Sequence, residues 1–194
     1  MTPVILYQLN NQTRLSLCGE YMMNRDQYYL NIAMAVRKKA NCIGRKVGAV
    51  IVKENRIIST GYNGTPEGMA NCLDGGCVRC KDQETYASST GYDVCICVHA
   101  EQNALITAAR FGNSIEGSII YSTLRPCFEC TKAMLQAKVH TIYYIHDWKH
   151  PIDSLQEQYE MAQNKLPGGV RQILIEDPDA DWANCKIAQL KEAV

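Results

Sequence analysis

The 194-residue sequence lacks an excess of charge of either sign, because 20 Lys and Arg residues balance 20 Asp and Glu residues. A balanced chain has no basic face of the kind that binds long nucleic acids, and no acidic tail. It also lacks any apolar run near the roughly 18 residues of a membrane span. At the N-terminus the only apolar run is Val4–Tyr7, too short for a signal peptide. We therefore expect neither a membrane nor a large nucleic acid as a partner.

Ten cysteines are the most unusual feature of the composition. They are nevertheless fewer than the roughly 8–10% that marks a disulfide scaffold. A chain without a secretory signal stays in a reducing compartment, where cysteines serve as metal ligands or catalytic groups rather than as disulfides. We expect a cytoplasmic protein, or one in the host cytoplasm if its source is a virus.

The length favours a single domain. Residues 1–24 are polar and aperiodic, so we interpret them as an N-terminal extension, and residues 25–194 as one domain. Within that domain, residues 64–98 carry cysteines and turn-forming residues without a sustained hydrophobic period. A loop of this length is uncommon unless it has a function or is cross-linked. We therefore expect residues 64–98 to be an insert held together through its cysteines.

Hydrophobic periodicity predicts the elements of the domain. The predicted helices are Asn24 to about Cys42, His99–Phe111, Pro126–Ala137, 153–164 and about 182–190. The predicted strands are Val47–Val52, Arg56–Thr60, Ser118–Thr123, Thr141–Ile145 and Val170–Ile175. The first two strands form a hairpin, and the others alternate with helices, which implies parallel crossovers. The predicted class is α/β, with helices on both faces of one sheet.

Two motifs stand at the starts of predicted helices that follow strands: His99-Ala100-Glu101 and Pro126-Cys127-Phe128-Glu129-Cys130. One His and two Cys are the three protein ligands of a catalytic Zn²⁺ that keeps its fourth position open. We expect His99, Cys127 and Cys130 to be these ligands, provided that the two helix starts meet at one sheet edge. Glu101 is left over as a proton carrier.

This pattern, H-x-E with P-C-x-x-C, is the known signature of zinc nucleobase deaminases. The predicted reaction is hydrolytic deamination, in which zinc supplies hydroxide at neutral pH and Glu101 moves protons to a ring nitrogen and to the leaving amine. The alternative is a non-catalytic structural zinc module, since a lone C-x-x-C is as often a zinc knuckle or a redox pair. Glu101 distinguishes the catalytic from the structural interpretation, because a structural zinc ion with four protein ligands does not need a further carboxylate beside it.

Over about residues 25–176 the sequence resembles the deoxycytidylate (dCMP) deaminase family. The resemblance rests on the two zinc motifs together with VGAVIV at 47–52, GYNGTPEG at 61–68 and Asn71-Cys72. It implies a cytidine deaminase-like fold, three layers α/β/α around a mixed sheet of about five strands. It also implies conversion of dCMP to dUMP, which supplies dTMP synthesis. Deoxycytidine, dCTP or another pyrimidine stay open as alternative substrates.

The resemblance assigns further roles. It implies that the backbone of Ala100 contacts the pyrimidine, that Asn55 binds the sugar and that Lys39 lies near the phosphate. Trp148 and Lys149 occupy the place of a Tyr-Arg pair that covers the base and binds the phosphate. Lys keeps the charge of Arg but lacks its two-pronged geometry.

Family members are often homohexamers activated by dCTP and inhibited by dTTP. By resemblance, Gly61, Tyr62, Asn63 and Gly64 form the site for this effector nucleotide with Mg²⁺, and glycines let backbone amides approach phosphate oxygens. An ordinary turn explains the same residues equally well.

Six cysteines outside the catalytic motifs predict a second, structural zinc ion, held by four of Cys42, Cys72, Cys77, Cys80, Cys95 and Cys97. The resemblance implies Cys42, Cys72 and Cys97 among the four, and the residues leave the full set open. Cys97 lies two residues before His99, so this ion also braces a catalytic ligand. Cys18 and Cys185 have no partner signal, and we expect them to be free thiols.

Overall fold

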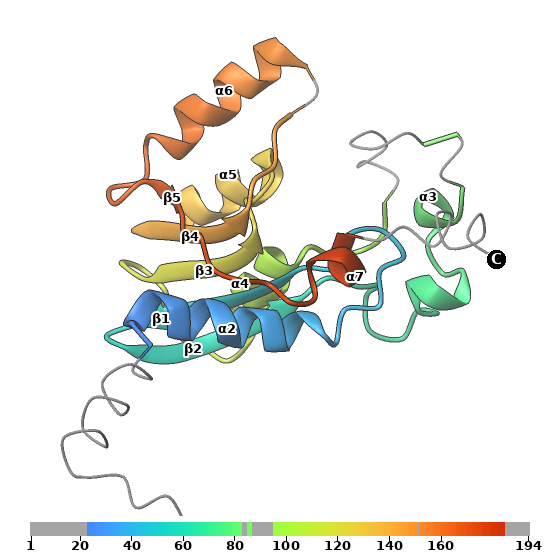
Figure 1. The fold of residues 1–194 in the computed structure, drawn as a ribbon, viewed down its shortest axis with the longest axis horizontal. Coiled ribbons are helices and arrows are strands. Elements are labelled where there is room, and N and C mark those ends of the chain that lie inside the picture. The colour runs from blue at the N-terminus through green and yellow to red at the C-terminus, as the bar shows by residue number, and fades with distance from the viewer. Residues whose placement is uncertain (1–22, 83–84, 87–94, 151, 185–194) are drawn as a thin grey trace, which may run out of the picture.

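The computed structural model describes residues 23–82, 85–86, 95–150 and 152–184. The predicted N-terminal extension, residues 1–24, therefore lies outside the described residues except for its last two positions. Cys18 and Cys185 also lie outside them. The centre of the fold is one five-stranded sheet with helices on both sides (Figure 1). Within the described residues, no helix has both the length and the apolar composition needed to cross a membrane.

The sheet has the order β2-β1-β3-β4-β5. Strands β1 (Gly48–Lys53) and β2 (Arg56–Tyr62) form the predicted hairpin. Strand β3 (Ile119–Leu124) pairs antiparallel with β1, whereas β4 (Thr141–His146) and β5 (Val170–Gln172) continue in parallel. The mixed sheet is as expected: β1 runs antiparallel to both of its neighbours, and the other four strands run in one direction.

Three layers result from the alternation of side chains along the strands. Helix α2 (Arg25–Arg37) covers one face, where Leu30 and Ala33 pack on Val50 and Tyr121. Helices α4 (Ala100–Arg110) and α5 (Phe128–Gln136) cover the other face, where Ala104 and Met134 join a second core cluster. Helix α6 (Asp153–Gln163) lies outside α5 in Figure 1. The α/β/α architecture is thus confirmed.

The insert has little regular structure, as its composition suggests. Its described part holds a 3-10 turn (Cys72–Asp74) and the four-residue helix α3 (Val78–Lys81). Its two ends meet at an isolated antiparallel bridge between Gly64 and Val98. Figure 1 shows α3 beyond the end of the sheet, far from α6.

Three boundaries differ from the predictions. Helix α2 ends at Arg37 rather than near Cys42, because the chain turns after Lys38 and Cys42 packs with the cysteines of the insert instead. Strand β5 ends at Gln172; Ile173 N donates one more hydrogen bond to the Tyr144 carbonyl on β4, and Ile173 and Ile175 pack on the core cluster beside α2. The described part of the last helix, α7, spans Ala180–Asn184 and begins earlier than predicted.

Candidate active site

The starts of α4 and α5 meet at one edge of the sheet. Strands β2 and β3 are not neighbours, because β1 lies between them, but both run antiparallel to β1 and so end at the same edge. His99 is the N-cap of α4, and Cys127 is the N-cap of α5. A capping position places each side chain at the positive end of a helix dipole, where a thiolate is favoured.

The three predicted zinc ligands converge. The Nδ1 atom of His99 lies 3.3 Å from the Sγ atom of Cys127 and 3.4 Å from that of Cys130, and all three ligand atoms are within 4.8 Å of one another. Hydrogen bonding from Cys130, opposed by burial and assisted by His99, lowers the pKa of the Cys127 thiol to about 4. Two sulfurs and one imidazole, with a thiolate already favoured, fit a zinc ion that keeps an open position.

Burial and charge also act on His99 and Glu101. Burial lowers the pKa of His99, but its contact with Cys127 outweighs this and raises the pKa to about 9. Glu101 is 4% exposed, and burial raises the pKa of its carboxyl group. The Ser122 hydroxyl donates a 2.8 Å hydrogen bond to Glu101 Oε1, while Oε2 faces the Cys130 sulfur at 3.6 Å. One carboxyl oxygen is thus held in place, and the other faces the ligand cluster.

A cavity opens over this cluster, and Ala100 and Trp148 line it together with His99 and Glu101. Trp148 is buried, and its ring meets the edge of Tyr159 at 5.6 Å with an interplanar angle of 83°. Tyr159 in turn donates a hydrogen bond to the carbonyl of Pro126, next to the zinc motif. The aromatic wall is therefore tied to the ligand-bearing loop.

Sequence reasoning missed four polar residues at the site. Arg45, Arg79 and Arg125 line the cavity, and Ser122 binds Glu101. Arg125 donates to Gln163 Oε1 from both Nε (3.0 Å) and Nη2 (2.6 Å), and pairs with Asp147. Its position at the end of a strand, directly before Pro126-Cys127, was a usable signal. No local signal identified the others.

Three residues implied by the resemblance lie elsewhere. Asn55 is in the hairpin turn, at the end of β1 and β2 opposite to the cavity, and its carbonyl accepts a hydrogen bond from Tyr29. The structure does not bring Asn55 to the cavity, and its sugar-binding role stays a prediction. Lys39 and Lys149 are exposed and do not line the cavity, so the cationic groups there are arginines instead.

The Gly61–Gly64 segment has packing roles. A Cβ atom on Gly61 would lie 2.1 Å from the carbonyl oxygen of Ala100, so glycine here lets β2 touch the start of α4. Asn63 lines the catalytic cavity and joins backbone groups, accepting from Val47 N at 2.7 Å and donating to the Arg45 carbonyl at 2.8 Å. Tyr62 is 41% exposed, and Gly64 forms the bridge to Val98. Close packing against α4 is thus one reason for glycine at position 61, and the effector-nucleotide role of Gly61–Gly64 stays a prediction.

All six of the other described cysteines come together. They form two groups of four whose sulfur atoms lie within 4.8 Å of one another. The first group is Cys42, Cys72, Cys80 and Cys97, and the second is Cys77, Cys80, Cys95 and Cys97. None of the described cysteines forms a disulfide.

Comparison with known proteins identifies the family. The model of the "cytidine and deoxycytidylate deaminase zinc-binding region" matches residues 23–146. The chain belongs to this family. Deoxycytidylate deaminase of Schizosaccharomyces pombe is 43% identical over 123 residues, which are 61% of this chain and 36% of that protein. The Saccharomyces cerevisiae enzyme is 37% identical over 64% of this chain and 38% of its own length. The chain thus spans little more than a third of these two relatives.

A solved structure agrees with this assignment. The dCMP deaminase of cyanophage S-TIM5, in complex with dCMP and dUMP, superposes with a TM-score of 0.59 and 29% identity. The match covers 79% of this chain and all of the phage chain. The cytidine deaminase-like fold expected from the sequence is confirmed.

Proposed function

We propose that this protein deaminates dCMP to dUMP by hydrolysis, with water consumed and ammonia released. The observation that carries the proposal is the convergence of His99, Cys127 and Cys130 beside the buried carboxyl group of Glu101, at the base of a cavity. The names of the relatives and the nucleotides bound by the phage enzyme support dCMP as the substrate. The product is the precursor for dTMP synthesis, and the reducing cytoplasm is the expected location.

His99, Cys127 and Cys130 are the proposed ligands of the catalytic zinc. When bound there, zinc supplies a hydroxide nucleophile at neutral pH by lowering the pKa of water. Glu101 accepts the proton of that water at Oε2, the oxygen that faces the ligands, and delivers protons to the pyrimidine N3 and then to the departing amine. Ser122 holds Oε1 and so keeps the carboxyl group oriented.

The cavity walls suggest how the nucleotide is held. Trp148 gives a flat apolar surface for the pyrimidine, and Ala100 lines the same cavity beside Glu101, where its backbone can contact the base. Arg45, Arg79 and Arg125 supply the positive charge that a 5′-phosphate needs. Regulation by dCTP and dTTP, an Mg²⁺-bound effector and a homohexamer rest on the family resemblance alone and stay predictions.

A first experiment tests the mechanism. In the full chain, Glu101→Gln should lower kcat for dCMP by about 10²- to 10⁴-fold, the usual contribution of general acid–base catalysis. The zinc content should stay unchanged. Glu129→Gln is the matched control, since Glu129 lies on α5 with 65% of its side chain exposed. Full turnover by the Glu101 variant would exclude this mechanism.

A second measurement tests the substrate. Release of ammonia is followed with dCMP, deoxycytidine and dCTP side by side, with and without added dCTP or dTTP. The highest kcat/KM should belong to dCMP, because the cavity arginines can bind its phosphate. Equal kcat/KM for deoxycytidine would show that the phosphate is not recognised, and no turnover of any of the three would reject the proposed function.

A further inference from the structure

The cysteines of the insert form the interior of that part of the chain. Cys72 and Cys77 are fully buried, and Cys42, Cys80 and Cys97 are at most 7% exposed. Among the described residues, the other hydrophobic side chains packed on this cluster are Ile43 and Ile96, each partly buried, together with Cys95. Two isoleucines and a four-residue helix give the described part of the insert little apolar packing, so we look for another source of its cohesion in the cysteines themselves.

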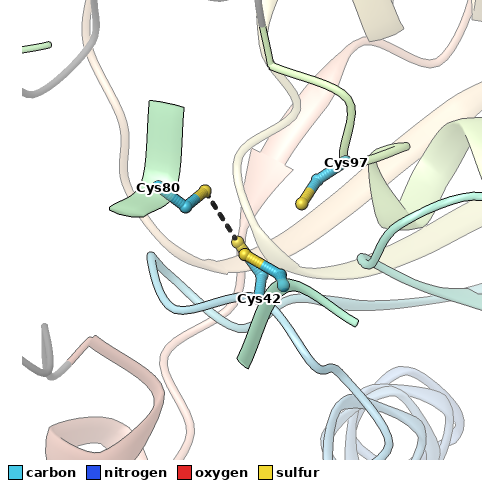
Figure 2. Close-up of side chains that lie close together, drawn as sticks. Cys42, Cys80 and Cys97 are labelled. Atoms are coloured by element: carbon cyan, nitrogen blue, oxygen red, sulfur yellow. Dashed lines mark hydrogen bonds between the residues drawn. The ribbon is translucent and has the colours of Figure 1, made fainter. Parts of the chain in front are cut away.

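The distances between sulfur atoms match those around a metal ion. Zinc binds four thiolates at about 2.3 Å in a tetrahedron, which places neighbouring sulfur atoms about 3.8 Å apart. Cys42 and Cys80 are separated by 3.8 Å, and Cys77 and Cys95 by 3.9 Å. A disulfide needs about 2.05 Å. Figure 2 shows the sulfur atoms of Cys42, Cys80 and Cys97 directed toward one another from three separate segments.

The two pairs belong to different groups of four. Cys42 and Cys72 complete one group, Cys77 and Cys95 complete the other, and both groups contain Cys80 and Cys97. Two separate tetrahedral ions need eight thiolates, but two ions that share an edge need six. A single ion would leave two thiols without a ligand role: either Cys42 and Cys72, which are both buried, or Cys77, which is buried, and Cys95, which is partly buried.

We propose that the insert binds two Zn²⁺ ions in a binuclear cluster, in which Cys80 and Cys97 bridge both ions. Cys42 and Cys72 are terminal ligands of the first ion, and Cys77 and Cys95 are terminal ligands of the second. The resemblance implied one structural ion near Cys42, Cys72 and Cys97. The second ion and the bridging role follow from the sulfur positions.

The chemistry of the ligands favours zinc. Tetrahedral sets of thiolates suit zinc or iron–sulfur clusters. In iron–sulfur clusters inorganic sulfide bridges the metals and cysteines are terminal ligands, whereas here two cysteine sulfurs belong to both groups. Six thiolates and two Zn²⁺ leave a net charge of −2, and Arg45 and Arg79 line the same cavity as Cys80 and Cys97. These cations compensate the residual charge.

The first test is made on the unmodified full chain, purified without chelators. Elemental analysis should give about three zinc ions per chain, one catalytic and two in the cluster. X-ray absorption at the zinc edge should show a Zn–Zn distance of about 3 Å, because ideal edge-sharing tetrahedra of 2.3 Å Zn–S bonds place their centres about 2.7 Å apart and longer bonds to the bridging sulfurs increase this distance. About two zinc ions without a Zn–Zn shell, or iron in place of zinc, would overturn the proposal.

Variants separate the two ions. Cys77→Ser and Cys95→Ser should each reduce the content from about three to about two zinc ions and abolish the Zn–Zn shell. Cys18→Ser is the control outside both groups of four, and it should keep about three. An unchanged zinc content in both variants rejects the second ion. If the variants do not fold, the zinc content and the Zn–Zn distance of the unmodified chain decide the question. Neither measurement depends on deamination, so a chain without deaminase activity could still be shown to hold the zinc cluster.

Discussion

The buried ion pair between Arg37 and Asp177 provides a sharp test of how the fold is held together. Arg37, in the last turn of α2, donates two hydrogen bonds of 2.7 Å to the Asp177 carboxylate. Both side chains are nearly inaccessible, at 1% and 2% exposed. His146 at the end of β4 contacts the same carboxylate at 2.6 Å. The pair thus ties the segment after β5 to α2 and to the sheet.

Asp177→Asn should be strongly destabilising, because it leaves the Arg37 charge buried without a counter-ion. Breaking a buried pair in this way costs about 3–5 kcal/mol, a large part of the roughly 5–15 kcal/mol that stabilises a typical domain. For a chain of this size the melting temperature should fall by about 6–20 °C. Lys38→Gln is the control. It breaks the neighbouring, more exposed ion pair between Lys38 and Asp179 and should lower the unfolding free energy by at most about 1 kcal/mol.

The pH dependence has a definite sign. The Arg37 hydrogen bonds, assisted by His146, hold the pKa of Asp177 well below its usual range despite burial. A carboxyl group with a lowered folded pKa contributes stability above its unfolded pKa of about 3.9, and this contribution is lost as the pH falls further. The difference in unfolding free energy between the original chain and Asp177→Asn should therefore be largest near pH 7 and shrink below pH 4.

Urea unfolding followed by circular dichroism at pH 7 and pH 3 measures these quantities. The double variant Arg37→Met/Asp177→Leu should recover much of the stability, because replacing both charges by apolar groups removes the unpaired charge. A loss below about 1 kcal/mol for Asp177→Asn at pH 7 would refute the reasoning. So would a double variant as unstable as the single one at every pH.

Two further substitutions probe the site. Gly61→Ala should lower both stability and activity, because the new Cβ lies 2.1 Å from the Ala100 carbonyl oxygen and displaces the start of α4. Gly44→Ala is the matched control, since its Cβ meets only the Cys42 sulfur at 3.6 Å, and equal melting temperatures for the two variants would contradict this account. Ser122→Ala should reduce kcat by about 10- to 150-fold with zinc retained, because it removes a hydrogen bond to Glu101 worth about 1.5–3 kcal/mol. Steady-state kinetics and metal analysis measure these two effects. An unchanged kcat would show that catalysis does not need the hydrogen bond from Ser122 to the Glu101 carboxyl group.

Local sequence predicted the parts of the site that depend on one element. Cys127 stands at a helix start shortly after the end of β3, and His99 stands at a helix start directly after the insert; hydrophobic period and spacing reveal such helix boundaries. The alternation of elements also predicted the layers. The order of β2, β1 and β3 was not available from periodicity, since strand pairing is decided by contacts between distant residues.

The residues that sequence reasoning misplaced or missed depend on such contacts. Asn55 fits a pattern but lies in a turn at the far end of the hairpin. Nothing in the local sequence marks Ser122 as functional. Its role depends on its hydrogen bond to Glu101, which the packing of α4 on the sheet creates. The six cysteines could be counted from the sequence, but their division into two groups requires Cys42, before β1, to meet a segment about 30 residues later along the chain.

The bridge between Gly64 and Val98 closes the insert at its base. Two hydrogen bonds, 3.2 Å and 2.9 Å long, pin the chain where it leaves and re-enters the domain. For a loop anchored in this way, doubling the length adds only about 0.6 kcal/mol of closure entropy. The length of chain between these two residues therefore has little effect on the stability of the sheet. The insert can change in length and content while His99, which directly follows the bridge, keeps its position at the start of α4.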